Sequence, residues 1–203
     1  IGGDTTRGPL TITVQAAGEV DHEHYLTRSG AKPGDLIFVT GTPGDAAAGL
    51  ASIQGHLTAN QQDHDYLTAR LNRPTPRVDI GLKLREIASS CIDISDGLVA
   101  DMGHIATSSE AGFTINTSQL PLSGHLLSAA GENAIIYALT GGDDYELCFT
   151  ISPDKYEQLS ACLGEQLITK VTQIGEITAN KAIKVIDKAG AELKLDASGY
   201  RHF

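Results

Sequence analysis

The sequence has few cysteines, and their spacing excludes one common class of small domain. Three cysteines occur in 203 residues, at positions 91, 148 and 162, and no two form a CxxC pair. Structural zinc sites combine closely spaced Cys and His ligands, so we do not expect a zinc module. Unpaired cysteines are typical of a reducing compartment, and we therefore expect a cytoplasmic protein.

Positive charge and long apolar runs are also scarce. The chain carries 15 Lys and Arg against 25 Asp and Glu, which gives a net charge of −10 at pH 7. A nucleic-acid surface needs a basic patch, so nucleic acid is not an expected partner. No apolar run approaches the roughly 20 residues that cross a bilayer, so we expect a soluble protein without a membrane partner.

Several well-known functional motifs are missing as well. The sequence contains no GxxxxGK[ST] loop, no HExxH pair and no EF-hand calcium loop. An ordinary P-loop site and an EF-hand are therefore excluded, and no arrangement for a covalent nucleophile is evident. Any chemistry must come from other residues.

Hydrophobic periodicity predicts a mixture of helices and strands without strict alternation. We therefore expect an α+β fold with a mixed or antiparallel sheet and helices packed on one side of it. The expected strands are 10–20, 36–41, 91–94, 112–117, 145–151, 167–177 and 182–187. The expected helices are 42–53, 61–71, 78–89, 96–108, 123–139 and 152–164.

The stretch CIDISDGLVADMGH, residues 91–104, places acids at the end of an apolar strand. Residues two apart on a strand point the same way, so Asp93 and Ser95 share a side. Asp96 lies in the following turn, where it could cap the next helix. The acids are either solvated around a capped helix, or they hold a cation between them. For Asp101, one turn further on, we expect a solvated or helix-supporting role.

Two other loops have a related composition. IGGDTTRGP, residues 1–9, could place Asp4 on Mg²⁺ and Arg7 on a phosphate, or it could be a surface turn. TGGDDYELCF, residues 140–149, could border a site, or it could be a tight turn before a strand. Taken together, three acidic loops at the edges of apolar strands favour carboxylates gathered around Mg²⁺ and phosphate. Phosphoryl transfer needs such positioning and charge neutralisation rather than a nucleophilic side chain.

Five segments, in this order and spacing, resemble those of the thiamine-monophosphate kinase family: GGDTTRGP, LTRSGAKPGD, VTGTPGDAAAGL, DISDGLVADMGHI and GGDDYELCF. That family belongs to the aminoimidazole ribonucleotide synthetase superfamily. The resemblance implies Mg²⁺-dependent transfer of the γ-phosphate of ATP to thiamine monophosphate, which gives thiamine diphosphate and ADP. It also implies a homodimer for the full-length protein.

The resemblance also implies roles for individual residues. By this comparison, ATP is bound by Gly3, Asp4, Arg28 and Ser95. Metal ions are held by Asp4, Asp93 and Asp96. Thiamine monophosphate contacts Asp143 and Tyr200. The family usually has Glu where this chain has Asp143, whose side chain is one methylene shorter.

The chain starts where the family's N-terminal domain is ending, and its first residue is Ile1. We therefore expect residues 1–20 to be a remnant of that ATP-binding and dimerisation domain, and residues 21–203 to form the C-terminal α+β domain. Such a piece would be inactive alone. Two other interpretations remain open at this point. The parent could be another ATP-using superfamily member, such as a purine-pathway synthetase or a hydrogenase-maturation protein, or the domain could bind nucleotide or metal without turnover.

Overall fold

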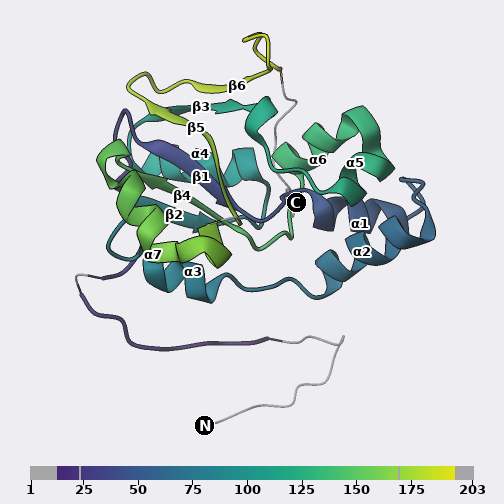
Figure 1. Cartoon of the computed structure of the whole chain (residues 1–203), viewed down its shortest axis with the longest axis horizontal. Coiled ribbons are helices and arrows are strands. Elements are labelled where there is room, and N and C mark those ends of the chain that lie inside the picture. Colours follow the sequence, from purple (N-terminus) through teal and green to yellow (C-terminus); the bar gives the residue numbers. More distant parts are fainter. Residues whose placement is uncertain (1–12, 23, 169, 195–203) are drawn as a thin grey trace.

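A six-stranded mixed sheet forms the centre of the computed structural model, which describes residues 13–22, 24–168 and 170–194 (Figure 1). The strand order is β2-β4-β1-β5-β3-β6, and only the β3–β6 pair is parallel. The strands are β1 (Leu36–Thr40), β2 (Ser90–Asp93), β3 (Gly112–Asn116), β4 (Leu147–Ile151), β5 (Val171–Thr178) and β6 (Ile183–Ile186).

Seven α-helices and three short 3₁₀ turns accompany the sheet in the described part of the chain. The helices are α1 (Asp45–Ile53), α2 (Gln61–Asn72), α3 (Val78–Leu84), α4 (Leu98–Ser108), α5 (Gly124–Ala130), α6 (Ala134–Thr140) and α7 (Tyr156–Ile168). None of the described helices is long and apolar enough to cross a membrane.

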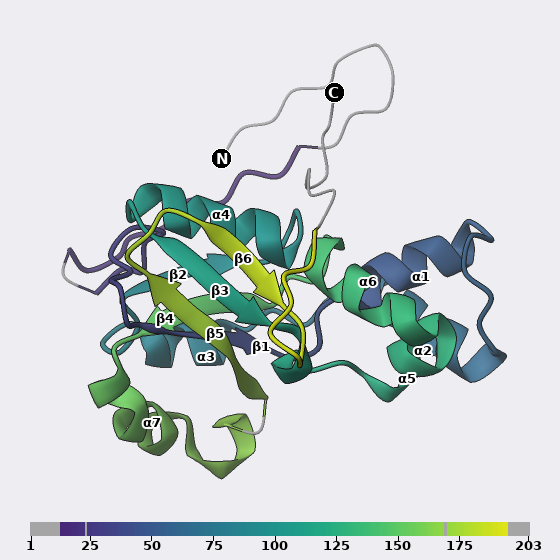
Figure 2. The same cartoon turned by 90° about the horizontal axis from the view of Figure 1, so that it is seen from above.

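Helices cover both faces of the sheet, because its central strands are apolar on both sides. In β1, Ile37 and Val39 face a core that includes residues of α4, whereas Phe38 faces a second core with residues of α3 and α7. Side chains alternate along a strand, so neighbours in sequence necessarily enter different cores. Figure 2 shows α4 and α7 on opposite sides of the sheet. The α+β class and mixed sheet are confirmed, but the expectation of helices on one side was wrong.

A separate helical layer of α1, α2, α5 and α6 lies beyond one end of the sheet (Figure 2). Its small core contains Ala48, Leu67, Leu126 and Ala134. Gly49 allows α1 and α2 to pack closely, since a Cβ atom there would overlap the carbonyl of Leu67. This layer supplies Arg70 on α2 and the N-terminus of α1, both of which hold the site described below.

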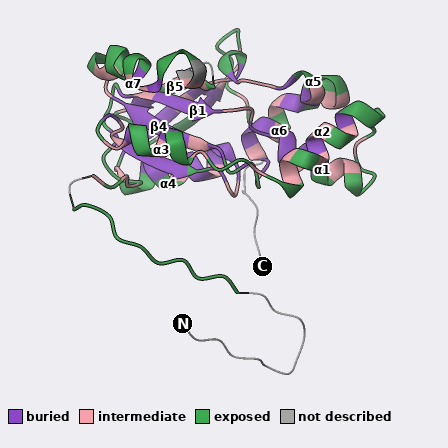
Figure 3. Cartoon of the chain, turned by 60° about the horizontal axis from the view of Figure 1, so that its bottom comes forward, coloured by how far each residue is buried: buried purple, intermediate pink, exposed green. Residues whose placement is uncertain are grey.

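The expected strand at 10–20 is not found in its described part. Residues 13–20 have no regular secondary structure, and all of them are exposed (Figure 3). A strand is stabilised by pairing, and none of these residues bonds to a neighbouring strand within the described chain. Several other predicted elements are shorter than expected; α3, for example, ends at Leu84, and β4 begins at Leu147. The helix expected at 123–139 is divided into α5 and α6.

Candidate active site

The two described acidic motifs meet at one edge of the sheet, because β2 and β4 are antiparallel neighbours. Backbone hydrogen bonds continue the pairing beyond both strands. The amide of Ile94 donates to the carbonyl of Glu146 (2.8 Å), and that of Tyr145 donates to the carbonyl of Ile94 (2.9 Å). The Asp143 amide donates to the carbonyl of Ser95 (3.0 Å). The turn 94–97 and the loop 141–146 therefore form one unit.

Two glycines permit this close approach. A Cβ atom on Gly142 would overlap the carbonyl oxygen of Ser95. On Gly97, whose φ is 125°, a Cβ atom would lie 2.8 Å from the carbonyl oxygen of Thr140. The glycines of SDG and TGGDD are thus needed where the two backbones touch.

Asp101 organises the turn from behind. Its side chain is 2% exposed, and its Oδ2 atom accepts hydrogen bonds from the amides of Ser95 (3.0 Å), Asp96 (3.0 Å) and Gly97 (3.2 Å). Burial raises the pKa of Asp101 from its ordinary value, although these bonds favour the charged form. The expectation of a solvated Asp101 was wrong, whereas its helix-supporting role is confirmed. The N-cap is Gly97 rather than Asp96.

The acids in front of the turn lack cationic partners. Asp93 and Asp143 are exposed, and Asp96 and Ser95 are half-buried. No Lys or Arg of the described ranges forms an ion pair with these three acids. Burial raises the pKa of Tyr145, and the negative charges of Asp143, Asp93 and Asp96 raise it further, so all three acids act on one side chain. Hard carboxylate oxygens fit a cation such as Mg²⁺.

A second observation concerns the ligand atoms around the turn. Oxygen or nitrogen atoms of Asp96, Asp101 and His104 all lie within 4.8 Å of one another. Because Oδ2 of Asp101 already accepts three backbone bonds, its main contribution is to order the turn. Asp93 and Asp96 are the acids that remain free to meet a ligand.

Of the other residues that the family resemblance implies, Arg28 lies in the described ranges, and it is not brought to this edge. Arg28 is exposed, and its carbonyl accepts a 3.4 Å hydrogen bond from Ser109, which follows the last residue of α4. It therefore lies at the opposite end of α4 from Asp96. Gly3, Asp4 and Tyr200 lie outside the described residues.

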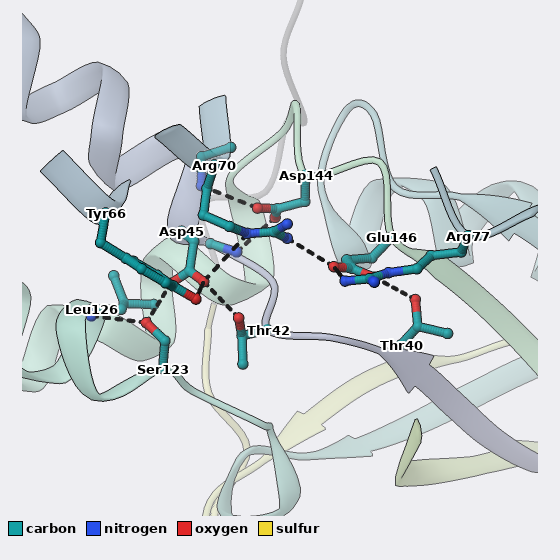
Figure 4. Close-up of polar contacts among 12 residues, drawn as sticks. Thr40, Thr42, Asp45, Tyr66, Arg70, Arg77, Ser123, Leu126, Asp144 and Glu146 are labelled. Carbon is teal, nitrogen blue, oxygen red and sulfur yellow. Dashed lines mark hydrogen bonds and ion pairs between the residues drawn. The ribbon is translucent and has the colours of Figure 1, made fainter. Parts of the chain in front are cut away.

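Sequence reasoning missed a buried polar cluster behind the loop 141–146 (Figure 4). The carboxylate of Asp144 accepts from the amides of Gly44 (2.6 Å) and Ala46 (3.1 Å) at the start of α1. Backbone amides and the helix dipole favour an anion there. Burial nevertheless dominates and raises the pKa of Asp144 to about 7.

Glu146 is the second buried acid of the loop, and two arginines bind it. Arg77 donates through Nε (2.6 Å) and Nη2 (2.5 Å), and Arg70 donates through Nη2 (2.7 Å). The Thr40 hydroxyl adds a 2.5 Å bond. Burial raises the pKa of Glu146, but the bonds from Arg77 and Thr40 and the arginine charges outweigh it, so the net pKa is lowered.

Asp45 completes the cluster in the helical layer. It accepts hydrogen bonds from the hydroxyls of Thr42 and Ser123, each 2.5 Å long, and Arg70 Nε lies 3.7 Å from its Oδ2. Burial alternates along the loop segment DDYE: Asp144 and Glu146 are buried, whereas Asp143 and Tyr145 are exposed. The sequence carries no clear signal for this, because Asp143 and Tyr145 have positive φ and the segment is not the extended strand that a period of two describes.

The chain belongs to the family of AIR synthase related proteins, C-terminal domain, whose model matches residues 32–188. Among curated proteins, it is similar to the thiamine-monophosphate kinase of Escherichia coli K12, with 48% identity over 205 residues. That alignment includes 100% of this chain and 63% of the relative, so the chain spans less than two thirds of the relative's length.

Solved structures give the same relationship. Thiamine-monophosphate kinase from Stenotrophomonas maltophilia K279a superposes with a TM-score of 0.75 and 43% identity, over 82% of this chain and 54% of the other. A structure of AaThiL complexed with AMPPCP and TMP superposes with a TM-score of 0.74 and 35% identity, over 89% and 55% of the two chains.

The role of Asp101 is tested by comparing two substitutions. Asp101→Ala leaves three turn amides without their acceptor and should lower the free energy of unfolding by about 2–4 kcal/mol. Asp101→Asn keeps one oxygen acceptor and should cost about half as much. Urea unfolding of both variants measures this, and equal stability of Asp101→Ala and the unmodified chain would contradict the role.

The raised pKa of Asp144 predicts a pH dependence of stability. Because the native carboxyl binds its proton more tightly than the unfolded one, its contribution is fully present below about pH 4. It is lost progressively as the pH rises to about 7. The free energy of unfolding should therefore fall less steeply over pH 4–7 in Asp144→Asn than in the unmodified chain. The free energy of unfolding is measured by urea titration of both proteins at several pH values. If it changes with pH equally in both, the raised pKa of Asp144 is refuted.

Proposed function

We propose that this chain carries the acidic site of an ATP-dependent kinase that phosphorylates thiamine monophosphate to thiamine diphosphate. The observation that supports this most strongly is the junction of the turn 94–97 with the loop 141–146. It presents Asp93, Asp96 and Asp143 together, without an Arg or Lys partner among the described residues. Relatives named thiamine-monophosphate kinase, together with the solved structure of AaThiL complexed with AMPPCP and TMP, indicate the two substrates.

Within this proposal, Asp93 and Asp96 would hold Mg²⁺. Bound Mg²⁺ neutralises phosphate charge and orients the transferring group. Asp101 and the Gly97 backbone keep in place the turn that carries Asp96 and directly follows Asp93, the last residue of β2. The hydroxyl of Ser95, between the two acids in sequence, would contact the nucleotide.

The reaction needs no covalent intermediate on the protein. A phosphate oxygen of thiamine monophosphate forms a bond to the γ-phosphorus of ATP, and the bond from that phosphorus to the β,γ-bridging oxygen breaks, which releases ADP. The protein's contribution is to hold both phosphates in line and to limit their repulsion. Asp143, across the loop from Asp93 and Asp96, would orient the acceptor substrate.

Further parts of the proposal concern a longer protein, because the chain matches only 63% of the length of its curated relative. Residues 1–20 would belong to a preceding domain for ATP binding and dimerisation, and residues 21–203 would form the second domain. Gly3, Asp4 and Arg28 would complete the nucleotide site, and Tyr200 would contact the substrate. The full protein would act in the cytoplasm as a homodimer.

Calorimetric titration of this chain tests the proposal. A Mg²⁺ complex of a non-hydrolysable ATP analogue is added first, and thiamine monophosphate second. Asp93→Asn/Asp96→Asn should weaken nucleotide binding at least about tenfold, because it removes the two negatively charged oxygen ligands that would hold the Mg²⁺ of the complex. The matched control, Asp65→Asn/Asp79→Asn, removes the same charge from exposed positions on α2 and α3.

Two results would refute the proposal. One is equal nucleotide affinity of the unmodified chain and the Asp93→Asn/Asp96→Asn variant. The other is failure of the full-length protein, with its preceding ATP-binding domain present, to bind thiamine monophosphate after the nucleotide analogue. If ATP is consumed only with an acceptor other than thiamine monophosphate, the protein is instead another ATP-using member of the superfamily.

A further inference from the structure

Tyr145 has a backbone conformation that is unusual for its residue type. Within the described ranges, three residues other than glycine have positive φ: Glu110 (54°), Asp143 (64°) and Tyr145 (51°). Left-handed backbone is uncommon for a bulky side chain and costs of order 1–3 kcal/mol. Gly or Asn would adopt it more easily. An aromatic residue here is better explained by what its side chain contacts than by the needs of the turn.

The residues on either side of Tyr145 hold this conformation in place. Asp144 is 1% exposed and bonded to the start of α1, and Glu146 is fully buried between Arg70 and Arg77. The amide of Tyr145 itself donates to Ile94. The backbone is thus fixed on both sides, yet the Tyr145 side chain remains 43% exposed. It lies at the surface rather than packed in a core.

The surroundings of the ring are anionic. The Tyr145 hydroxyl lies 3.4 Å from Oδ1 of Asp143, and the charges of Asp93 and Asp96 act on the same group. No aromatic ring of the described chain stacks on Tyr145. An open aromatic face beside carboxylates attracts a flat cation, because the ring quadrupole and the acids both favour positive charge.

We propose that Tyr145 is a substrate-binding residue whose ring contacts the cationic thiazolium of thiamine monophosphate. This inference rests on the proposed function and adds the group that recognises the non-phosphate part of the substrate. Asp143, next to the ring, reinforces the preference for a cation. The two halves of one junction then have separate tasks: Asp93 and the turn 94–97 recognise phosphate, and the loop 141–146 recognises the ring.

A tryptophan reporter tests the contact without relying on turnover. The chain contains no tryptophan, so Tyr145→Trp introduces a single indole. Thiamine monophosphate, added after a Mg²⁺–ATP analogue, should quench its fluorescence saturably. The matched control is Tyr156→Trp on α7, where the tyrosine is similarly exposed at 49%, and its emission should not respond.

Affinities measured by calorimetry complete the test. Tyr145→Ala should weaken binding of thiamine monophosphate about 3- to 30-fold and leave the affinity for the nucleotide analogue unchanged. Tyr145→Phe keeps the ring and should restore most of the affinity. Glycerol phosphate, a control ligand with a phosphate but no cationic ring, should have the same affinity for the unmodified chain and for Tyr145→Ala.

The possible failures are distinguishable. If the unmodified chain binds thiamine monophosphate and Tyr145→Ala binds it equally well, Tyr145 is not a contact and only this inference fails. If Tyr145→Ala loses nucleotide and thiamine monophosphate together, the residue has a structural role, which also overturns the inference. If the full-length protein binds the nucleotide analogue but ignores thiamine monophosphate, the proposed function fails and this inference fails with it.

Discussion

The buried carboxylate of Glu146 is the contact on which the rest of the site depends. It accepts bonds from Arg70, Arg77 and Thr40, and these come from α2, from the segment before α3 and from β1. A buried charge is tolerated only when it is paired and fully hydrogen-bonded, so these elements have one compatible arrangement around it. The backbone of Tyr145, directly before Glu146, is thereby held in place, although the Tyr145 side chain remains exposed.

Buried and exposed side chains alternate along residues 143–146, so the bonds of Glu146 also position the exposed residues of the candidate site. Asp144 and Glu146 point into the helical layer, whereas Asp143 and Tyr145 stand at the surface opposite Asp93 and Asp96. The two pairs of acids therefore have different roles. Asp144 and Glu146 are bonded to backbone amides and arginines, whereas Asp93 and Asp96 are left for a ligand. The helical layer thus positions the acidic edge of the sheet.

Part of this arrangement could be predicted from sequence. Apolar strands such as 36–40 and 90–93 have a strong local signal, and the grouping of Asp93, Asp96 and Asp143 followed from acids placed beside strands. The burial of Glu146 could not be predicted, because it depends on partners that are distant in sequence; Arg70 and Glu146 are 76 residues apart. The partners of Asp101 are close in sequence, but the helical pattern does not show that its carboxylate turns back to the amides of 95–97. The strand expected at 10–20 is absent from its described part, 13–20, for a related reason: alternation shows that a segment can pair, but not that a partner strand is available.

Paramagnetic broadening by Mn²⁺ tests most directly whether the turn and the loop form one cation site. Mn²⁺ takes the same oxygen ligands as Mg²⁺, and it broadens amide signals of nearby residues in a spectrum of the ¹⁵N-labelled chain. Substoichiometric Mn²⁺ should first broaden residues 93–97 and 142–145 together, and Asp93→Asn/Asp96→Asn should abolish this. Broadening centred on other acids, or on only one of the two segments, would contradict a shared site at their junction.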